Sequence, residues 1–391
     1  MALIFKMIGI LVLFCTTIFP SNAQELNPLH QILDAKKPEI SRVMDSLPDH
    51  ALQIRYTHIS RDSKGNRSFK TYDFQTDDAN YFYPASTVKL PVAVLALEHM
   101  VGKELKNGTR VNLDTPYQIK GDTLTSSLRK DIEAIFAVSD NEAYNRLYEL
   151  LGRDSINAYL KNKALEPLQI VHRLSTPNAA EAKTRDVVFY PESKKTVTRN
   201  GYTSTAIRKL QLKGIQKGKG FMQNDSLISG AFDFSSKNYY PVSTQQELMK
   251  RLLFPQEYLK SERFVLDKKT RRFLLRTMHK MPRQLGYDDS HYQDSYGKFF
   301  MYGDRKNRIP SHIQIFNKVG YAYGTLTDNA YIKDKKNNIE FLLTVTILVN
   351  KNQIFNDNRY EFDSVGIPFL AELGRQVYSY EQAIRQKDRK K

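Results

Sequence analysis

The chain has 391 residues, a formal net charge of +17 and 41% hydrophobic residues, with one Cys and no Trp. This apolar fraction supports a sizeable core, so the composition excludes intrinsic disorder for most of the chain. A single Cys cannot pair within the chain, which excludes a disulfide scaffold. The basic charge would attract any anionic surface, so nucleic acid is the first partner to consider.

The first residues have the pattern of a signal peptide. Lys6 precedes an apolar run of 13 residues at 7–19, and small residues follow up to Ala23. The run is shorter than the ~20 apolar residues that span a bilayer, and the small residues stand where a signal peptidase cleaves. A buried N-terminal helix is the alternative. We expect cleavage of residues 1–23 after Ala23, export to the periplasm, and no membrane anchor on the mature chain.

Periodicity predicts strands near both ends of the chain and helices between them. We expect helices at 28–46, 86–100, 142–151, 244–253 and 364–386, the first of them interrupted or started at Pro38. Two further helices are expected, one that ends near Val138 and one that begins near Asp267. We expect strands at 52–60, 67–74, 313–319, 323–333 and 339–349. The turn residues 63–66 make the first two strands a hairpin, and Thr244 with Glu247 is typical of a capping box.

This order of elements predicts an α+β fold. An antiparallel sheet of about five strands is built from both chain ends and flanked by helices, with an inserted all-helical lobe. Residues 187–241 differ from the rest, because they carry nine Lys and Arg against three acidic residues and include the Gly-rich run 213–220. We interpret this segment as a basic, loop-rich insertion.

Several common catalytic motifs do not occur in the sequence. The eight His residues are scattered, without a close pair at metal-ligand spacing. There is no G-x-S-x-G motif and no Walker loop. The sequence therefore argues against a metallohydrolase, an α/β-hydrolase and a P-loop enzyme, and we expect no metal and no cofactor.

A Ser-x-x-Lys motif stands at the start of an expected helix. Ser86 and Lys89 are three residues apart, so their side chains share one face of that helix. A Ser hydroxyl needs a base to become a good nucleophile, and burial near a helix N-terminus favours the neutral, basic form of Lys. The alternative is a capping Ser with a solvated Lys. The same spacing occurs at 127–130 and 295–298, to which we assign no chemistry.

The sequence Ser139-Asp140-Asn141 lies between two expected helices. Three good capping residues in a row are also what an ordinary helix junction would show. In a functional interpretation, the Ser139 hydroxyl relays a proton and the Asn141 amide holds a substrate amide.

The sequence Lys318-Val319-Gly320 ends a predicted strand. A Lys at this place supplies a fixed positive charge, and a Gly lets a substrate backbone approach closely. The alternative is an ordinary surface strand end.

Together and in this order, the three motifs resemble those of class A β-lactamases and penicillin-binding proteins, a superfamily of serine acyl-enzymes. The expected order of helices and strands is also similar to the fold of that superfamily. The resemblance covers most of 28–386, apart from the insertion at 187–241 and a smaller one at about 284–311. It implies that residues 24–391 form a single β-lactamase-like catalytic domain.

The resemblance implies a role for each polar residue of the motifs. Ser86 would attack the substrate carbonyl and become acylated, with Lys89 as its base or assisting it. Ser139 would protonate the leaving nitrogen, aided by Lys318.

The resemblance also implies the groups that bind substrate. Asn141 would bind the acyl side-chain amide, and Asn145 would support the neighbouring loop. Backbone N–H groups of Ser86 and Tyr321, the latter beside Gly320, would form the oxyanion hole.

The chain departs from the class A pattern in two places. Val319 replaces the Ser or Thr whose hydroxyl helps to hold the substrate carboxylate. The deacylating Glu is expected about three dozen residues after the second motif, where this chain has Ser175. Glu181 is the best remaining candidate for it, and Arg173 is a candidate ion-pair partner for Asp186.

These observations favour an exported serine hydrolase of the class A type, which opens β-lactam or related amide bonds. A penicillin-binding D-alanyl-D-alanine carboxypeptidase or esterase with slow deacylation is the alternative, and a non-catalytic cell-wall binder is the second. The expected partner is a small-molecule β-lactam or a peptidoglycan peptide. Nucleic acid is not expected, because the positive charge is spread without a recognised binding motif, and the oligomeric state stays open.

Overall fold

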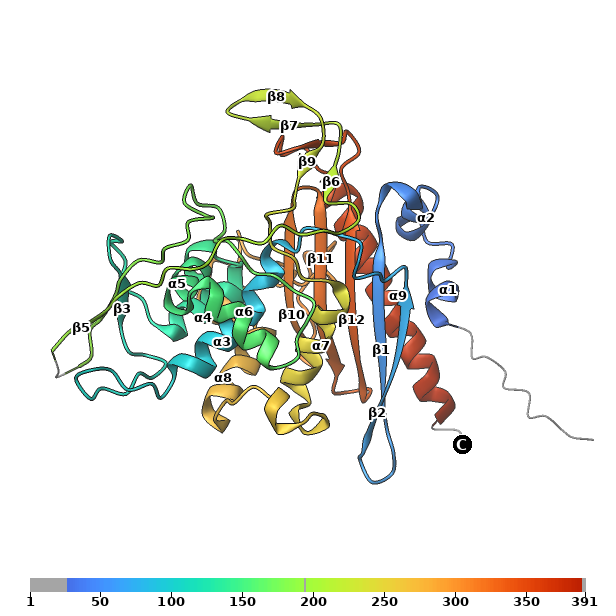
Figure 1. The fold of residues 1–391 in the computed structure, drawn as a ribbon. Coiled ribbons are helices and arrows are strands. Elements are labelled where there is room, and N and C mark those ends of the chain that lie inside the picture. The colour runs from blue at the N-terminus through green and yellow to red at the C-terminus, as the bar shows by residue number, and fades with distance from the viewer. Residues whose placement is uncertain (1–26, 193–194, 389–391) are drawn as a thin grey trace, which may run out of the picture.

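The computed structural model describes residues 27–192 and 195–388, so the expected signal peptide at 1–23 lies outside the described residues. The chain has the predicted α+β fold (Figure 1), with a five-stranded sheet in the order β10-β11-β12-β1-β2. Neighbouring strands of this sheet are antiparallel throughout. The strands are β1 (Gln53–Arg61), β2 (Arg67–Phe74), β10 (Ile313–Ala322), β11 (Thr325–Asp334) and β12 (Ile339–Leu348).

Pairing between β1 and β12 joins the two ends of the chain into one sheet. Ile54 lies opposite Val345 in this register, and both side chains are fully buried. β12 is buried along almost its whole length because helices cover both faces of the sheet. The β1–β2 hairpin confirms the one predicted from the turn at 63–66.

Three helices from the chain ends pack together on one face of the sheet, and two others contact the opposite face (Figure 1). The first group is α1 (Pro28–Leu33), α2 (Pro38–Met44) and α9 (Ile367–Asp388), and the second is α7 (Val242–Leu253) and α8 (Lys268–His279). Pro38 opens α2, so the helix expected over 28–46 is two short helices. A Pro fits the first turn because its missing N–H would have no partner there.

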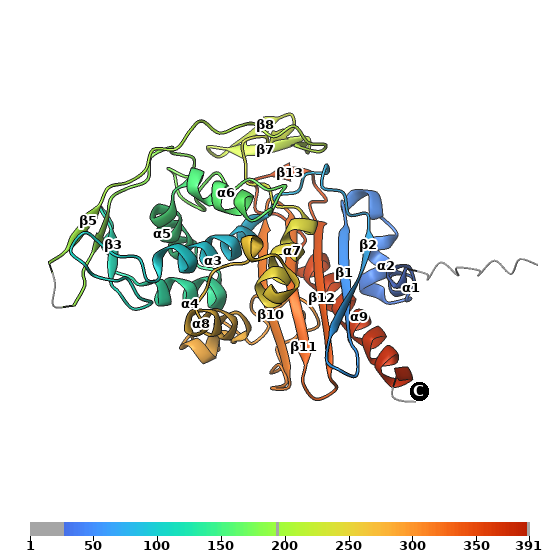
Figure 2. The ribbon, with the colours of Figure 1, turned by 60° about the horizontal axis from the view of Figure 1, so that its bottom comes forward.

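A helical lobe lies beside the sheet, next to β10 (Figure 2). Its helices are α3 (Lys89–Met100), α4 (Leu128–Val138), α5 (Asn141–Leu151) and α6 (Arg153–Asn162). Fully buried residues at helical spacing, such as Ile132 and Ile135 of α4, form its core with Leu147 of α5. The lobe therefore holds the start of α3 against the junction of α4 and α5, where two of the three motifs lie.

Residues 187–192 and 195–241 form short strands and loops. The strands are β4 (Val187–Phe189), β5 (Val197–Arg199), β6 (Gln216–Lys217), β7 (Gly220–Gln223), β8 (Ser226–Ser229) and β9 (Phe232–Asp233). β4 pairs with β3 (Tyr117–Ile119) on one side and with β5 on the other, and β7 pairs with β13 (Ile354–Phe355). The β7–β8 hairpin projects at the top of Figure 1. Phe234 packs edge-on against Tyr323 and Phe355, which fixes the segment beside the end of β10.

The predicted capping box at Thr244 and Glu247 is wrong. α7 begins two residues earlier, after Pro241, so both residues lie inside the helix. Thr244 donates to the Pro167 carbonyl at 3.0 Å, and Glu247 accepts from Arg251 at 2.8 Å. Within 27–192 and 195–388, the structure contains no helix long and apolar enough to cross a membrane.

Candidate active site

Ser86 lies in a tight turn at the entrance to α3. The turn is a 3-10 helix at Ala85–Val88, and residues three apart are eclipsed in such a helix, so Ser86 and Lys89 share a face. Ala85 has a φ of 47°, a strained conformation for a residue with a side chain. The Thr87 hydroxyl donates to the Pro84 carbonyl at 2.7 Å and stabilises the turn. The Ser86 hydroxyl forms no hydrogen bond with any described residue, which leaves it available to a substrate.

Lys89 is fully buried and joins the first motif to the second. Its Nζ donates to the Ser139 carbonyl at 2.5 Å and to Asn141 Oδ1 at 2.6 Å, and it lies 3.3 Å from Ser139 Oγ. Burial lowers the pKa of Lys89 to about 7, and the nearby Asp140 carboxylate opposes this shift only in part. A large fraction of Lys89 is therefore neutral at physiological pH and able to accept a proton.

The junction of α4 and α5 presents the second motif. Ser139 caps the C-terminus of α4 in the left-handed conformation, with a φ of 56°. The Asp140 side chain accepts the N–H of Ala143 at 2.7 Å and caps α5. The junction is thus the ordinary capping arrangement, and it also directs Ser139 and Asn141 to the amine of Lys89.

Lys318 of β10 reaches the same serine from the sheet. Its Nζ donates to Ser139 Oγ at 2.8 Å and to the Val319 carbonyl at 2.9 Å. Burial lowers the pKa of Lys318 well below its usual value, and the charge of Lys89 lowers it further. Because Ser139 Oγ accepts hydrogen bonds from two amines, its own proton is left to be donated elsewhere.

Gly320 allows β10 to lie directly against the turn of Ser86. A Cβ on Gly320 would stand 2.7 Å from both the Pro84 carbonyl and the Ser86 nitrogen, which no other residue could accommodate. The next residue, Tyr321, has an exposed fraction of 49%. Tyr321 and Ser86 line one cleft of about 540 Å³.

Val319 does not face this cleft. Its side chain is 3% exposed and belongs to the core on the opposite side of β10, together with Phe299, Phe300 and Leu326. The first two of these belong to 284–311, the smaller segment expected as an insertion. The apolar side chain at this position therefore suits its surroundings.

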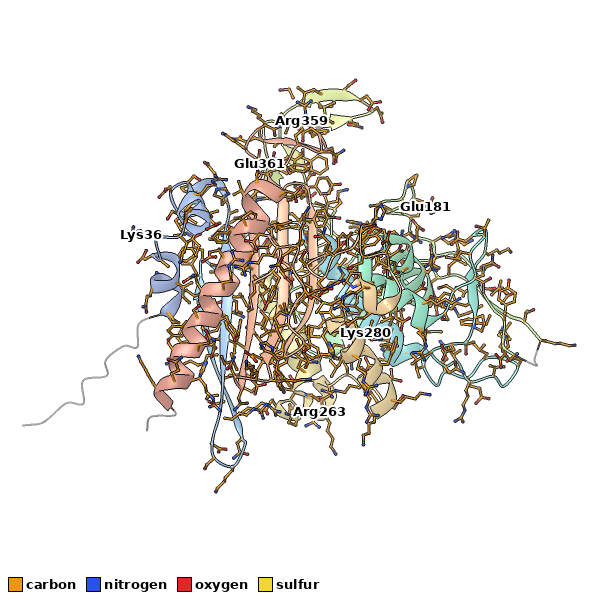
Figure 3. The ribbon with its side chains drawn as sticks, turned by 180° about the vertical axis from the view of Figure 1, so that it is seen from behind. Lys36, Glu181, Arg263, Lys280, Arg359 and Glu361 are labelled. Carbon is orange, nitrogen blue, oxygen red and sulfur yellow. The ribbon has the colours of Figure 1, made fainter. Side chains whose placement is uncertain are left out.

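No Asp or Glu is among the eighteen described residues that line the cleft. Ser175 occupies the wall next to the second motif, where it accepts a hydrogen bond from Asn141 Nδ2 at 2.9 Å. Asn145 holds the same loop through two 2.9 Å hydrogen bonds with the backbone of Leu174. Glu181 does not line the cleft and is exposed, on the rim of the helical lobe in Figure 3.

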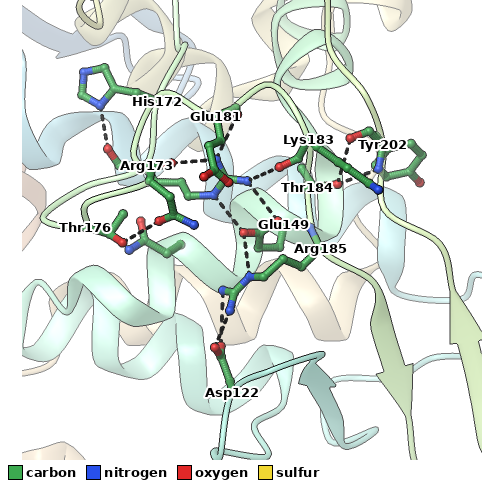
Figure 4. Close-up of polar contacts among 12 residues, drawn as sticks. Asp122, Glu149, His172, Arg173, Thr176, Glu181, Lys183, Thr184, Arg185 and Tyr202 are labelled. Carbon is green, nitrogen blue, oxygen red and sulfur yellow. Dashed lines mark hydrogen bonds and ion pairs between the residues drawn. The ribbon is translucent and has the colours of Figure 1, made fainter.

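The loop behind this wall is fixed by buried charges, which Figure 4 shows. Arg173 donates to both carboxylate oxygens of Glu149, at 2.8 and 3.1 Å, and both side chains are almost completely buried. Arg185 joins Glu149 to Asp122. The expected pair of Arg173 with Asp186 is wrong, because Asp186 accepts the N–H of Gly201 at 3.0 Å and a weaker bond from Lys120.

The structure thus brings Ser86, Lys89, Ser139, Lys318 and Asn141 to one place, with Gly320 and Tyr321 along its edge. Sequence reasoning missed other cleft residues, namely Tyr83, His172, Lys237 and Tyr323. Tyr83, His172 and Tyr323 belong to no catalytic sequence motif. Lys237 is one of nine basic residues in 187–241, and nothing in the sequence distinguishes it from the others. Within the described part of the chain, no group of three or more His, Cys, Asp or Glu residues is placed to hold a metal ion.

The fold and the site define a serine hydrolase of the β-lactamase type. The chain belongs to the beta-lactamase enzyme family, whose sequence pattern matches residues 37–380. No curated protein matches the sequence.

Solved structures with a similar fold include a beta-lactamase from Desulfarculus baarsii. It is 13% identical, with 87% of this chain and 96% of that chain covered and a TM-score of 0.48. A beta-lactamase from Sphaerobacter thermophilus is also 13% identical, covers 87% of this chain and 94% of its own, and has a TM-score of 0.45.

Proposed function

We propose that Ser86 attacks the carbonyl of an amide, ester or β-lactam and forms an acyl-enzyme. Neutral Lys89 takes the Ser86 proton as the new C–O bond forms. The burial of Lys89 and its lowered pKa support this role, because a base works best when its pKa is near the ambient pH. Backbone N–H groups of Ser86 and Tyr321 stabilise the oxyanion of the tetrahedral intermediate.

The leaving group receives its proton from Ser139. The hydroxyl of Ser139 transfers a proton to the departing nitrogen or oxygen as the C–N or C–O bond breaks, and Lys89 returns the proton taken from Ser86 to Ser139. Contacts of both lysines with Ser139 Oγ support this path. Asn141, which binds Lys89 and Ser175, offers its amide to the acyl side chain.

Water attacks the acyl-enzyme slowly in this proposal. The observation that supports it is the cleft wall, where the described lining residues include no carboxylate and Ser175 is the partner of Asn141. A Ser hydroxyl is not a general base for water at neutral pH. The proposed activity is therefore that of a D-alanyl peptidase or esterase that β-lactams acylate, rather than of a fast class A β-lactamase.

The proposed setting is outside the cytoplasm. The pattern of residues 1–23 supports export, and a peptidoglycan peptide is then an accessible substrate. Expression of the full chain followed by N-terminal sequencing of the secreted form tests this, and a mature protein that starts elsewhere than residue 24 would contradict the cleavage site.

A chromogenic cephalosporin tests the proposed chemistry. The protein is incubated with it while colour release and intact mass are followed. We expect colour equivalent to about one turnover and an adduct of acyl mass on Ser86, both lost in Ser86→Ala. Ser295→Ala is the matched control, because residues 295–298 repeat the Ser-x-x-Lys spacing outside the cleft.

Two other outcomes are distinguishable. Sustained colour release that depends on Ser86 would show rapid deacylation and support a β-lactamase of the class A type. A folded protein with neither colour release nor adduct would contradict acylation by β-lactams and favour cell-wall binding without catalysis.

A further inference from the structure

One cation of the cleft has no assigned partner. Lys237, which follows β9, lines the same cleft as Ser86 and is partly buried. Its Nζ lies 5.9 Å from the ring centres of Phe232 and Tyr323. Among the described residues, no carboxylate lies within ion-pair distance of this amine, and none contributes to its pKa.

An unpaired ammonium in such a place is costly. Burial lowers the pKa of Lys237, since the charged form loses hydration that no ion pair replaces. The two aromatic rings offset only part of this cost, because 5.9 Å is near the limit of a cation–π contact. An anion in the cleft would restore the missing interaction.

The other cations of the cleft are already engaged. Arg173 is committed to Glu149 and to backbone carbonyls of its own loop. Lys89 and Lys318 lie behind the cleft, on Ser139. Among the described lining residues, Lys237 is therefore the cation that a substrate can reach.

The residue next to Lys237 is hydrogen-bonded to the loop that carries Ser175. The next residue, Asn238, accepts the N–H groups of Val171 and His172 through its side-chain oxygen, at 2.8 and 3.3 Å. His172 itself is neutral at pH 7, because burial lowers its pKa to about 4. Asn141, which is proposed to hold the acyl group, contacts the same loop at Ser175.

Aromatic rings complete the pocket. Tyr83 contacts Tyr323 with ring centres 4.9 Å apart and stacks parallel to His172 at 6.1 Å. The pocket thus combines flat apolar walls with one free positive charge, a combination that suits a hydrophobic acyl group ending in an anion.

We propose that Lys237 is a specificity-determining residue that selects acyl donors whose acyl side chain carries a carboxylate. The inference rests on the proposed acylation of Ser86, and it names the substrate class of that site. It assigns to the basic segment 187–241 a direct part in recognition.

Two penicillins that differ in one carboxylate test this. Acylation rates at low concentration are measured by intact mass for benzylpenicillin and for its α-carboxy analogue. We expect the wild type to favour the carboxylated compound by about 2- to 5-fold, the range for a solvent-accessible charge pair. In Lys237→Met the ratio of the two acylation rates should fall to near 1. In Lys237→Arg, which keeps the positive charge, most of the preference for the carboxylated penicillin should remain.

Lys219→Met is the matched control, since Lys219 is an exposed lysine of the same segment outside the cleft. The ratio of the two acylation rates in Lys219→Met should equal that of the wild type. An equal ratio in the wild type and in Lys237→Met would overturn the assignment.

A binding measurement separates failure of this inference from failure of the proposed function. If neither penicillin acylates Ser86, the affinities of phenylmalonate and phenylacetate are compared by NMR titration. Tighter binding of phenylmalonate that is lost in Lys237→Met supports the anion pocket without acylation, and equal affinities would overturn it.

Discussion

Asn141 Nδ2 donates a 2.9 Å hydrogen bond to Ser175 Oγ, and this contact closes the wall of the cleft beside the second motif. The same asparagine accepts a hydrogen bond from Lys89 through its oxygen. The amide therefore connects the proposed base to a neutral hydroxyl. In the proposed mechanism the outcome of the reaction depends on that hydroxyl, because no carboxylate among the described lining residues lies beside it to activate water.

A carboxylate at position 175 should speed the release of the acyl group. Ser175 is exposed, so a larger side chain has room. We expect Ser175→Glu to shorten the lifetime of the Ser86 adduct by roughly 100-fold, the lower end of general-base catalysis. Mass spectrometry after removal of free β-lactam measures this. Ser175→Gln is the control of equal size. Equal adduct lifetimes in the Glu and Gln variants would show that a carboxylate at position 175 does not activate water.

The rate of acylation should rise with pH through about 7. Lys89 accepts a proton only when neutral, and its pKa is lowered to about 7, so acylation should fall about tenfold per pH unit below that value and level off above it. Adduct formation between pH 5 and 9 checks the profile. Lys89→Arg, which stays charged, should lose acylation by at least about 100-fold. A wild-type rate that is flat across this range would exclude Lys89 as the base.

A hydroxyl at position 319 should not raise the rate of acylation. The side chain of Val319 faces the core, so Val319→Thr buries a hydroxyl and should cost about 1–2 kcal/mol in the free energy of unfolding. Urea unfolding and acylation are measured on the same preparation. Faster acylation in Val319→Thr would mean that the side chain of residue 319 reaches substrate.

The charge cluster at Glu149 should be essential for stability. Glu149 is fully buried and is the ion-pair partner of the buried Arg173, so Glu149→Gln leaves that guanidinium without a counter-charge, whereas Arg185 keeps Asp122. We expect a loss of about 3–5 kcal/mol in the free energy of unfolding. Glu181→Gln, on the exposed rim of the same loop, should change it by less than about 0.5 kcal/mol and leave the adduct lifetime unaltered. Equal urea midpoints for the two variants would contradict this account.

Much of the fold could be predicted from the sequence because its signals are local. Runs rich in apolar and β-branched residues, separated by turn residues, marked the strands β1, β10, β11 and β12, and Pro38 marked a helix start. The motifs located the polar residues around Ser139 for the same reason, since each motif is a short run next to a helix end or a strand end.

Other features depend on contacts between distant segments. The direction of Val319 is set by Phe299 and Phe300, which cover that face of β10. The partner of Arg173 is set by the path of the loop past Glu149, 24 residues earlier in the chain. No periodicity distinguishes Lys237 from its basic neighbours, because only the aromatic cluster brings it to the cleft.

The lifetime of the Ser86 acyl-enzyme tests the central claim most directly. The wild-type protein is acylated with a β-lactam, the excess is removed, and intact mass is followed over time. Slow attack by water predicts an adduct that persists for many minutes and maps to Ser86. An adduct that disappears within seconds, with continuous β-lactam turnover, would contradict the account and identify a fast β-lactamase.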